Sequence, residues 1–206
     1  KDSFSNKIMV ITGGPGTGKT TIINGIIKVY LKMGQKVLLT APTGRAAKRM
    51  TEATGYEAKT IHRLLEYSPG AGSQEGGFKK NETNPLNANL VIVDETSMVD
   101  TSLMYHFLKA LPPSTTLILV GDVDQLPSVG PGNVLKDIIE SGCVPTIWLN
   151  EIFRQSQASM IIENAHRINR GMMPSTHYVK EHLHDFYFFT IEEPEDVLKK
   201  IVLLCK

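Results

Sequence analysis

The sequence has little cysteine and no long apolar run, and each scarcity narrows the class of protein. Only two of its 206 residues are cysteines, Cys143 and Cys205. They stand far apart in the sequence, so we expect no disulfide framework and a reducing compartment, the cytoplasm. No apolar run approaches the ~18 residues that span a membrane, and we expect no signal peptide at the start of the chain. We therefore expect no membrane partner.

The net charge of the chain is also small, but a small net charge excludes few classes of partner. The formal net charge is +1, and a balanced chain can still carry a local basic groove that binds nucleic acid. The six histidines show no spacing typical of metal ligands. Hydrophobic residues make up 41% of the chain, enough for a sizeable buried core.

Short apolar runs alternate with helical patterns along the chain. The runs are mostly β-branched residues or leucine and are apolar on both faces, which is typical of buried parallel strands. This alternation predicts an α/β fold, with a parallel sheet covered by helices on both faces. The predicted strands are 8–11, 37–40, 90–93, 116–120, 146–149 and 186–191. The predicted helices follow Lys19, precede Pro112, Gly142 and Gly171, and cover 195–204.

One segment interrupts the alternation. Residues 68–89, SPGAGSQEGGFKKNETNPLNAN, are rich in glycine, serine, asparagine and proline. This composition predicts a surface loop inserted into the fold, with a small hairpin around Phe78 and Lys79.

The first predicted strand runs into GGPGTGKT, residues 13–20. The segment fits the phosphate-binding pattern G-x-x-x-x-G-K-[ST] and lies between a strand and a helix, the context that the pattern requires. Glycines let successive N–H groups point inward as an anion-binding nest, and the following helix adds its positive end. Lys19 would reach the β- and γ-phosphates of ATP, and Thr20 would offer a hydroxyl to Mg²⁺. The competing interpretation is a plain glycine-rich turn.

Two acids follow the buried run LVIV at 90–93. Because ligands bind at the carboxyl ends of the strands in open α/β sheets, Asp94 should point toward the crevice that holds the phosphate loop. There it would complete the Mg²⁺ shell, and Glu95 would orient or deprotonate the attacking water. Alternatively, Asp94 caps the next helix and Glu95 is solvated.

The segment LVGDVDQLPSVGPG, residues 119–132, repeats this arrangement with an amide. Its strand should lie beside the other two, so that Asp122 also ends near the crevice. Gln125 can both donate and accept hydrogen bonds, so it can contact the γ-phosphate or its water. A rigid loop with the γ-phosphate at one end and a partner at the other is a plausible switch.

Six motifs then carry a resemblance. GGPGTGKT, APTGRAAKRM, TIHRLL, VDETSMVD, GDVDQLPSVGPG and LNEIFRQ occur in that order and cover nearly the whole chain. Together they resemble superfamily 1 DNA helicases, most closely the RecD-like branch (the exodeoxyribonuclease V alpha subunit family). The resemblance implies a RecA-like P-loop NTPase fold, with residues 1–206 as one RecA-like ATPase domain, the first motor domain of a longer protein.

The resemblance also implies roles by position. The expected nucleotide-binding residues are Gly14, Pro15, Gly16, Thr17, Gly18, Lys19, Thr20 and Thr21, with Thr20 and Asp94 holding Mg²⁺. The expected catalytic residues are Lys19, Glu95, Gln125 and Arg154, the last reaching the γ-phosphate. The residues expected to contact single-stranded DNA are Thr40, Pro42, Thr43, Gly44, Arg45, Thr60, His62, Arg63, Pro127 and Ser128.

Several of these roles have simpler competitors. Arg45, Lys48 and Arg49 can be only a solvated helix face. His62 can simply cap or pack, and Arg154 can pair with Glu151. The single tryptophan, Trp148, is expected in the core rather than under a base, and so are the aromatic residues of 186–189.

The implied partners are single-stranded DNA, a second RecA-like domain of the same parent chain, and the nuclease or helicase subunits of a larger complex. Only KDSFSNK precedes the first strand, so the resemblance leaves the selection of adenine unexplained, and the motifs expected of the second motor domain do not occur in these 206 residues. We therefore expect a fragment that hydrolyses ATP slowly if at all and does not unwind DNA alone. The resemblance suggests 5′-to-3′ movement in DNA recombination and repair. The alternatives are a P-loop ATPase or phosphotransferase switch without a nucleic-acid partner, and a scaffold with a relic P-loop.

Overall fold

The computed structural model describes residues 6–70, 77–151, 159–176 and 185–205. Its contacts divide the chain into two compact units, Lys1–Ile152 and Phe153–Lys206. The first unit holds the predicted sheet. Each unit is described by itself.

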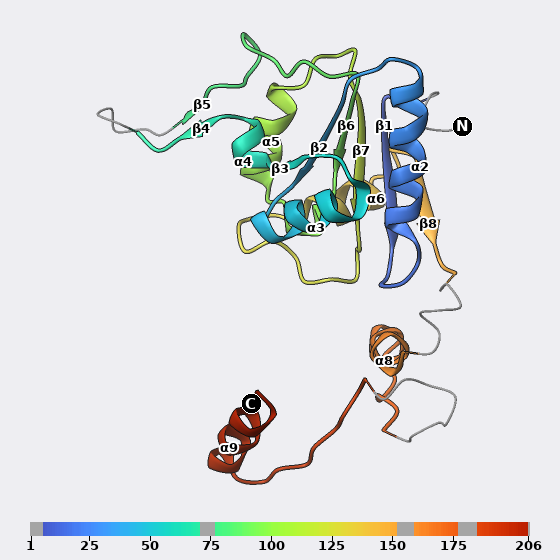
Figure 1. Ribbon diagram of the computed structural model, residues 1–206, viewed down its shortest axis with the longest axis vertical. Coiled ribbons are helices and arrows are strands. Elements are labelled where there is room, and N and C mark those ends of the chain that lie inside the picture. The colour runs from blue at the N-terminus through green and yellow to red at the C-terminus, as the bar shows by residue number, and fades with distance from the viewer. Residues whose placement is uncertain (1–5, 71–76, 152–158, 177–184, 206) are drawn as a thin grey trace. The chain divides into compact units, whose positions relative to one another are not determined.

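A six-stranded sheet of parallel strands forms the centre of the first unit, in the order β3-β2-β6-β7-β1-β8 (Figure 1). The strand that leads into Asp122 and Gln125, β7, lies between β1 and β6. This confirms the prediction that it lies beside the strands that end in the phosphate loop and in Asp94. All three strands therefore end at the same edge of the sheet. The strands are β1 (Ile8–Gly13), β2 (Val37–Ala41), β3 (Ala58–Thr60), β6 (Leu90–Val93), β7 (Thr116–Gly121) and β8 (Thr146–Leu149).

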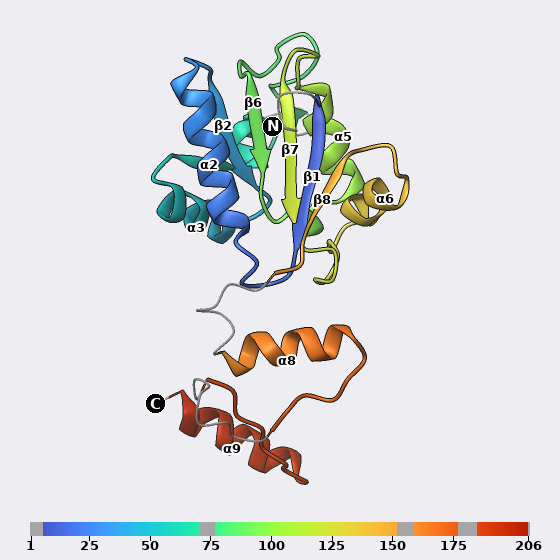
Figure 2. The same ribbon diagram turned by 90° about the vertical axis from the view of Figure 1, so that its right-hand side faces the viewer.

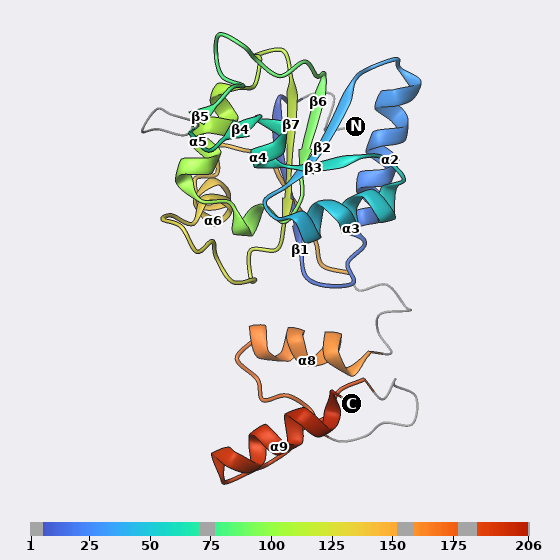
Figure 3. The same ribbon diagram turned by 60° about the vertical axis from the view of Figure 1, so that its left-hand side comes forward.

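Helices cover both faces of the sheet, as the alternation predicted (Figure 2). On one face lie α2 (Lys19–Lys32) and α3 (Gly44–Thr54). On the other lie α4 (Ile61–Leu64), α5 (Thr101–Lys109) and α6 (Val134–Glu140), as Figure 3 also shows. The centre of the sheet is thus buried on both sides, and this is why β6 and β7 are almost entirely apolar rather than alternating with polar residues.

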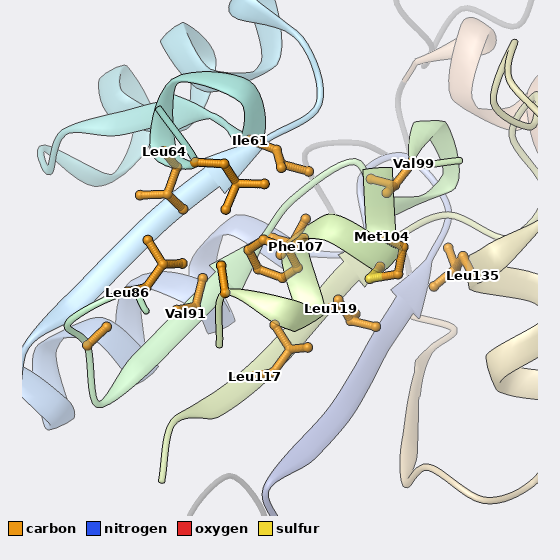
Figure 4. Close-up of a cluster of buried hydrophobic side chains, with 14 of the residues drawn as sticks. Ile61, Leu64, Leu86, Val91, Val99, Met104, Phe107, Leu117, Leu119 and Leu135 are labelled. Atoms are coloured by element: carbon orange, nitrogen blue, oxygen red, sulfur yellow. The ribbon is translucent and has the colours of Figure 1, made fainter. Parts of the chain in front are cut away.

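Successive strand residues feed two separate cores, one on each face. In β7, Leu117 and Leu119 face the core beneath α5, whereas Ile118 and Val120 face the core beneath α2. Figure 4 shows Phe107 of α5 at the centre of the first core, where its side chain is fully buried. Burying a side chain of this size stabilises the fold by roughly 1.5–3 kcal/mol relative to leaving it exposed.

The inserted segment is only partly a surface loop. Its start confirms the predicted hairpin: β4 (Tyr67–Ser68) pairs antiparallel with β5 (Gly77–Phe78). Its end is different, because Leu86 is 4% exposed and its N–H donates to the carbonyl of Ala110. The prediction of a surface loop over 68–89 is therefore wrong near Leu86. Its sequence neighbours are mostly polar, but its own apolar side chain packs in the core under α5.

Two predictions about aromatic residues are wrong. Trp148 is 52% exposed rather than core, because β8 is the edge strand of the sheet and pairs only with β1. Residues 186–191 do not form a strand. Tyr187 and Phe189 are instead exposed and stacked on each other, with ring centroids 6.5 Å apart. Aromatic residues favour β-strands, but a strand forms only where a neighbouring strand pairs with it, and these residues have no such partner among the described strands.

The second unit contains the two helices that the sequence predicted, α8 (Met160–Asn169) and α9 (Pro194–Leu204). Ser159 caps α8, and the carboxylate of Asp185 accepts hydrogen bonds from the Ser159 hydroxyl and the Met160 N–H. No residue of α9 is buried within the described part of the chain. The assignment of all 206 residues to one RecA-like domain stays a prediction.

Candidate active site

The phosphate loop connects the end of β1 to the start of α2. Gly16 and Gly18 have φ angles of 76° and 83°, a left-handed conformation that favours glycine. Gly13 is required for a different reason: a Cβ there would lie 2.7 Å from the carbonyl oxygen of Leu149 in the neighbouring strand. The loop therefore needs glycine for its turns and for its close approach to β8.

Lys19 is folded back over this loop. Its ammonium donates hydrogen bonds to the carbonyls of Gly13 (2.6 Å) and Gly14 (3.0 Å). The Thr17 hydroxyl also donates to Gly14, at 2.8 Å. A cation held at the mouth of a glycine-rich turn that opens into a helix fits a phosphate group. This arrangement favours the nucleotide interpretation over a plain turn.

The end of β6 presents Asp94 and Glu95. One carboxylate oxygen of Asp94 accepts a hydrogen bond from the Glu95 N–H at 2.9 Å. Glu95 has a φ of 52°, which turns the chain sharply into a short 3-10 helix, Thr96–Met98. Glu95, not Asp94, occupies the N-cap position of that helix, and it makes no side-chain cap. The alternative in which Asp94 caps the next helix is therefore wrong.

Both carboxyl groups are partly withdrawn from water. Burial raises the pKa of Asp94 above its ordinary value, against the Glu95 N–H and the charges of Lys19 and Arg49, which lower it. Burial, and then the neighbouring Asp94 charge, raise the pKa of Glu95. Lys19 and Arg49 again act in the opposite direction. Perturbed carboxyl groups of this kind cluster at functional sites.

A pocket brings the predicted residues together. Thr20, Asp94 and Glu95 line it, although they lie far apart in the sequence. Hydroxyl and carboxylate oxygens are the ligands that Mg²⁺ prefers, so Thr20 and Asp94 fit the predicted metal role. No group of three or more histidine, cysteine or acidic ligands occurs among the described residues. The other lining residues are Ile23, Ala46, Arg49, Met50, Ala53 and Thr54.

The amide of Gln125 is held by the buried acid before it. Asp122, at the end of β7, is only 2% exposed. Its carboxylate accepts the Asp124 N–H at 3.1 Å and the Gln125 side-chain amide at 3.4 Å. Asp122 therefore folds the turn and orients Gln125, which is itself exposed. Sequence reasoning placed Asp122 near the crevice but missed this orienting role.

The loop after Gln125 is pressed against the start of α5. A Cβ at Gly130 would lie 2.1 Å from the Asp100 carboxylate, so the approach needs glycine. The Ser128 hydroxyl donates within the loop, to Gly130 (3.0 Å) and Gly132 (3.1 Å). Leu126 remains 86% exposed, and Pro127 is exposed beside it. The loop is anchored at its base and offers an apolar tip to solvent.

The threonines predicted to contact DNA are engaged inside the fold. Thr40 is fully buried, and its hydroxyl donates to the Lys59 carbonyl at 2.8 Å. Thr43 caps α3 by accepting the Ala46 N–H, and Thr60 caps α4 by accepting the Arg63 N–H, both at 3.2 Å. The sequence analysis did not predict these two helix caps. A threonine directly before a helical pattern would have indicated each of them.

The other predicted DNA-contacting residues differ in exposure. Arg45, Gly44, His62 and Arg63 are exposed, whereas Pro42 is half-buried. The His62 ring packs against two rings of the hairpin, with centroids 5.6 Å from Tyr67 and 5.7 Å from Phe78. The packing interpretation of His62 is thereby confirmed, and its exposed edge remains available to a ligand.

One expected catalytic residue cannot be placed in this geometry. Arg154 lies outside the described residues, so its reach to the γ-phosphate stays a prediction. Of the nucleotide-binding set, Thr20 and Thr21 are exposed, Thr17 is buried, and the rest are partly exposed.

Among the described residues, no helix is long and apolar enough to cross a membrane.

Comparison with known proteins agrees with this geometry. A family model described as an AAA domain matches residues 1–131. The chain is 42% identical over 170 residues to the ATP-dependent RecD2 DNA helicase of Deinococcus radiodurans, covering 82% of this chain and 23% of that protein. The chain belongs to the AAA domain family. Within superfamily 1 its similarity is to the RecD-like branch.

The chain is also similar to a second RecD protein and to a solved helicase structure. The RecBCD enzyme subunit RecD of Mycolicibacterium smegmatis is 39% identical over 163 residues, covering 68% of this chain and 29% of that protein. The Pif1 helicase structure from Candida albicans matches with a TM-score of 0.58 and 26% identity, over 84% of this chain and 43% of its own. The RecD-like chain thus spans about a quarter of the length of the curated relatives it matches.

Proposed function

We propose that this chain is the ATP-hydrolysing first motor domain of a DNA helicase or translocase. The observation that carries the proposal is the pocket that joins Thr20 at the start of α2 to Asp94 and Glu95 at the end of β6. These groups stand beside the phosphate loop, and they are the parts that phosphoryl transfer requires. The names of the RecD-like relatives, which are helicases or subunits of a helicase–nuclease, agree with this role.

Hydrolysis would proceed by in-line attack of water on the γ-phosphate. In this scheme Lys19 leaves the loop carbonyls and pairs with the β- and γ-phosphates. Glu95 orients the water and accepts its proton. Gln125, held by Asp122, contacts the γ-phosphate, and Arg154 stabilises the charge that develops there. Thr20 and Asp94 would hold Mg²⁺, which when bound neutralises charge on the phosphate oxygens.

Single-stranded DNA would run across the ends of β2 and β3. Arg45, His62 and Arg63 are exposed there and would contact the strand mainly through phosphates, with little reading of sequence. The caps made by Thr43 and Thr60 leave these side chains at the first turns of α3 and α4. Pro127 and Ser128 would border the same path. Thr40 is fully buried and its carbonyl accepts the Asp94 N–H at 2.9 Å, so it would fix the end of β2 rather than contact the strand directly.

The wider setting is part of the proposal and is supported only by the resemblance to RecD-like helicases. We expect the parent protein to carry a second RecA-like domain, to move 5′-to-3′ along the strand, and to act in recombination or repair in the cytoplasm. Nuclease or helicase subunits of a larger complex are the expected partners, by analogy with the RecBCD name of one relative. Unwinding needs two domains that open and close, so residues 1–206 alone should show none.

The deciding experiment is the ATPase rate with and without single-stranded DNA. The longest natural polypeptide that contains this chain would be assayed with oligo(dT), beside Lys19→Ala and Arg45→Ala variants. We expect stimulation by DNA that Lys19→Ala abolishes at all DNA concentrations. Arg45→Ala should shift the half-maximal DNA concentration upward and leave the DNA-free rate unchanged.

Hydrolysis that is indifferent to DNA would overturn the proposal. A phosphotransferase or a nucleotide-switched module would then account for the pocket, and the search would turn to a protein or small-molecule acceptor. Absence of ATP binding in the wild-type protein would instead favour a scaffold with a relic loop.

A further inference from the structure

The pocket beside the two acids has a second wall, made by α3. Ala46, Arg49 and Met50 line it from this helix. The Arg49 guanidinium lies 4.0 Å from the Glu95 carboxylate, and the two residues are 46 positions apart in the sequence. The Arg49 side chain is 72% exposed, so it belongs to the solvated face of the helix, and from that face its guanidinium reaches Glu95. Its charge also acts on Asp94.

The helix that carries Arg49 is firmly placed. Ala46, Ala47 and Met50 are buried beneath it. The Asn24 amide of α2 donates to the Ala53 carbonyl at 3.0 Å, and Thr51 accepts the Ala58 N–H of β3 at 2.9 Å. Because α3 is tied to both neighbours, the base of the Arg49 side chain moves only when the whole helix moves.

Glu95 needs an external partner to hold its side chain. Its backbone is in the left-handed region, with a φ of 52°. It makes no side-chain cap on the 3-10 helix that follows. Arg49 forms the ion pair that meets its carboxylate. The contact joins one guanidinium nitrogen to one carboxylate oxygen at 4.0 Å, so it is a charge attraction rather than a hydrogen bond.

We propose that Arg49 is a positioning residue that holds the Glu95 carboxylate at the nucleotide pocket and links it to α3. Arg45 precedes Arg49 by four residues, about one turn, so both lie on the same side of the helix. A DNA phosphate held by Arg45 would therefore act on the rigid helix that orients the catalytic base. This inference rests on the proposed function, and it gives DNA a physical route to the rate of hydrolysis.

The test uses Arg49→Ala, Arg49→Lys and the matched control Lys48→Ala in the longest natural polypeptide. Lys48 is the neighbouring cation and is exposed to a similar degree, 79% against 72% for Arg49, but it pairs within its own helix with Glu52 rather than with Glu95. ATPase kinetics would be measured with and without oligo(dT), together with the Kd for oligo(dT) and the Tm. We expect Arg49→Ala to lower the DNA-stimulated kcat about tenfold, as for a misplaced catalytic group. The KM for ATP, the Kd and the Tm should change little.

Arg49→Lys should restore part of the lost rate, and Lys48→Ala should match the wild type. An equal loss in Lys48→Ala, an unchanged kcat in Arg49→Ala, or a loss explained by a lower Tm would overturn the inference. Failure of the proposed function looks different, because the wild-type rate would then ignore DNA. In that case an unchanged basal kcat in Arg49→Ala overturns the positioning role, and a reduced one supports it.

Discussion

Two regions at the carboxyl edge of the sheet hold their charged groups in opposite ways. At the ends of β1, β6 and β7, Asp94 and Glu95 are partly buried and have raised pKa values. At the ends of β2 and β3, Arg45 and Arg63 project into solvent from helix starts that threonines cap. The first region suits chemistry, which gains from few, desolvated and fixed charges. The second suits a mobile, sequence-neutral strand, which exposed cations can follow.

The difference also shows where each region is vulnerable. On the proposed function, the loss of one charge in the first region would remove a reacting group. In the second region it would remove one of several DNA contacts. Mutations should therefore act strongly and on turnover in the acidic region, and moderately and on affinity in the basic region.

The largest effect is expected for Glu95→Gln. Removal of the group that prepares water should lower kcat by about 10²–10⁴-fold, while ATP still binds because Lys19 and the loop are intact. Stopped-flow binding of a fluorescent ATP analogue, beside steady-state turnover, separates the two quantities. An equal loss of ATP affinity would contradict the assignment of the acidic region to turnover, because it would make Glu95 a binding group.

A smaller effect is expected for Arg45→Ala. Loss of one phosphate contact should weaken oligo(dT) binding about tenfold and reduce the salt slope of log K by about 0.7. Fluorescence anisotropy over a range of salt concentrations measures both. Lys48→Ala, on the same helix, is the control and should leave the slope unchanged. An unchanged slope in Arg45→Ala would place the strand elsewhere.

A third effect concerns the N-cap of α3, which supports the basic region without carrying a charge. Thr43→Val keeps the shape of the side chain but removes the oxygen that accepts the Ala46 N–H. We expect it to lower the free energy of unfolding by about 1 kcal/mol, with DNA affinity falling only as far as α3 frays. Urea denaturation gives the first quantity and anisotropy the second. A loss of DNA affinity without a loss of stability would instead indicate a direct contact by the hydroxyl.

The smallest effect is expected for the stability of Asp94→Asn. Because burial raises the folded-state pKa of Asp94, the folded protein binds this proton more tightly than the unfolded chain. Stability is therefore lost as the pH rises from the ordinary carboxyl range through the raised pKa. The neutral amide avoids this loss, so Asp94→Asn should raise the Tm at pH 7 by about 2 °C while hydrolysis falls.

Calorimetry at pH 4 and pH 7 checks the sign, since the gain should shrink at the lower pH. Asp124→Asn serves as the control, because that carboxylate is exposed. A destabilised Asp94→Asn at pH 7 would show that the hydrogen bond from Glu95 outweighs the cost of burial.

Much of the acidic region was predictable from the sequence because its signals are local. The glycine pattern of residues 13–20 and the apolar run before Asp94 each fit into one strand and one turn. Parallel strands end at one edge, so the meeting of Thr20, Asp94 and Glu95 followed from topology alone. The helix at 160–169 and the two-sided burial of the strands were predictable for the same reason, since periodicity is a local signal.

Only the tertiary structure decided the rest. The exposure of Trp148 depends on β8 being an edge strand, and the burial of Leu86 depends on α5 lying over it. Neither property belongs to the residue or its neighbours in sequence. The roles of Thr40 and Asp122 are likewise set by the strands and turns around them. Arg49 shows the principle most clearly: a charge in a basic run becomes a partner of Glu95 only because two distant segments pack together. Local chemistry is set by the order of residues, whereas the pairing of charges is set by the fold.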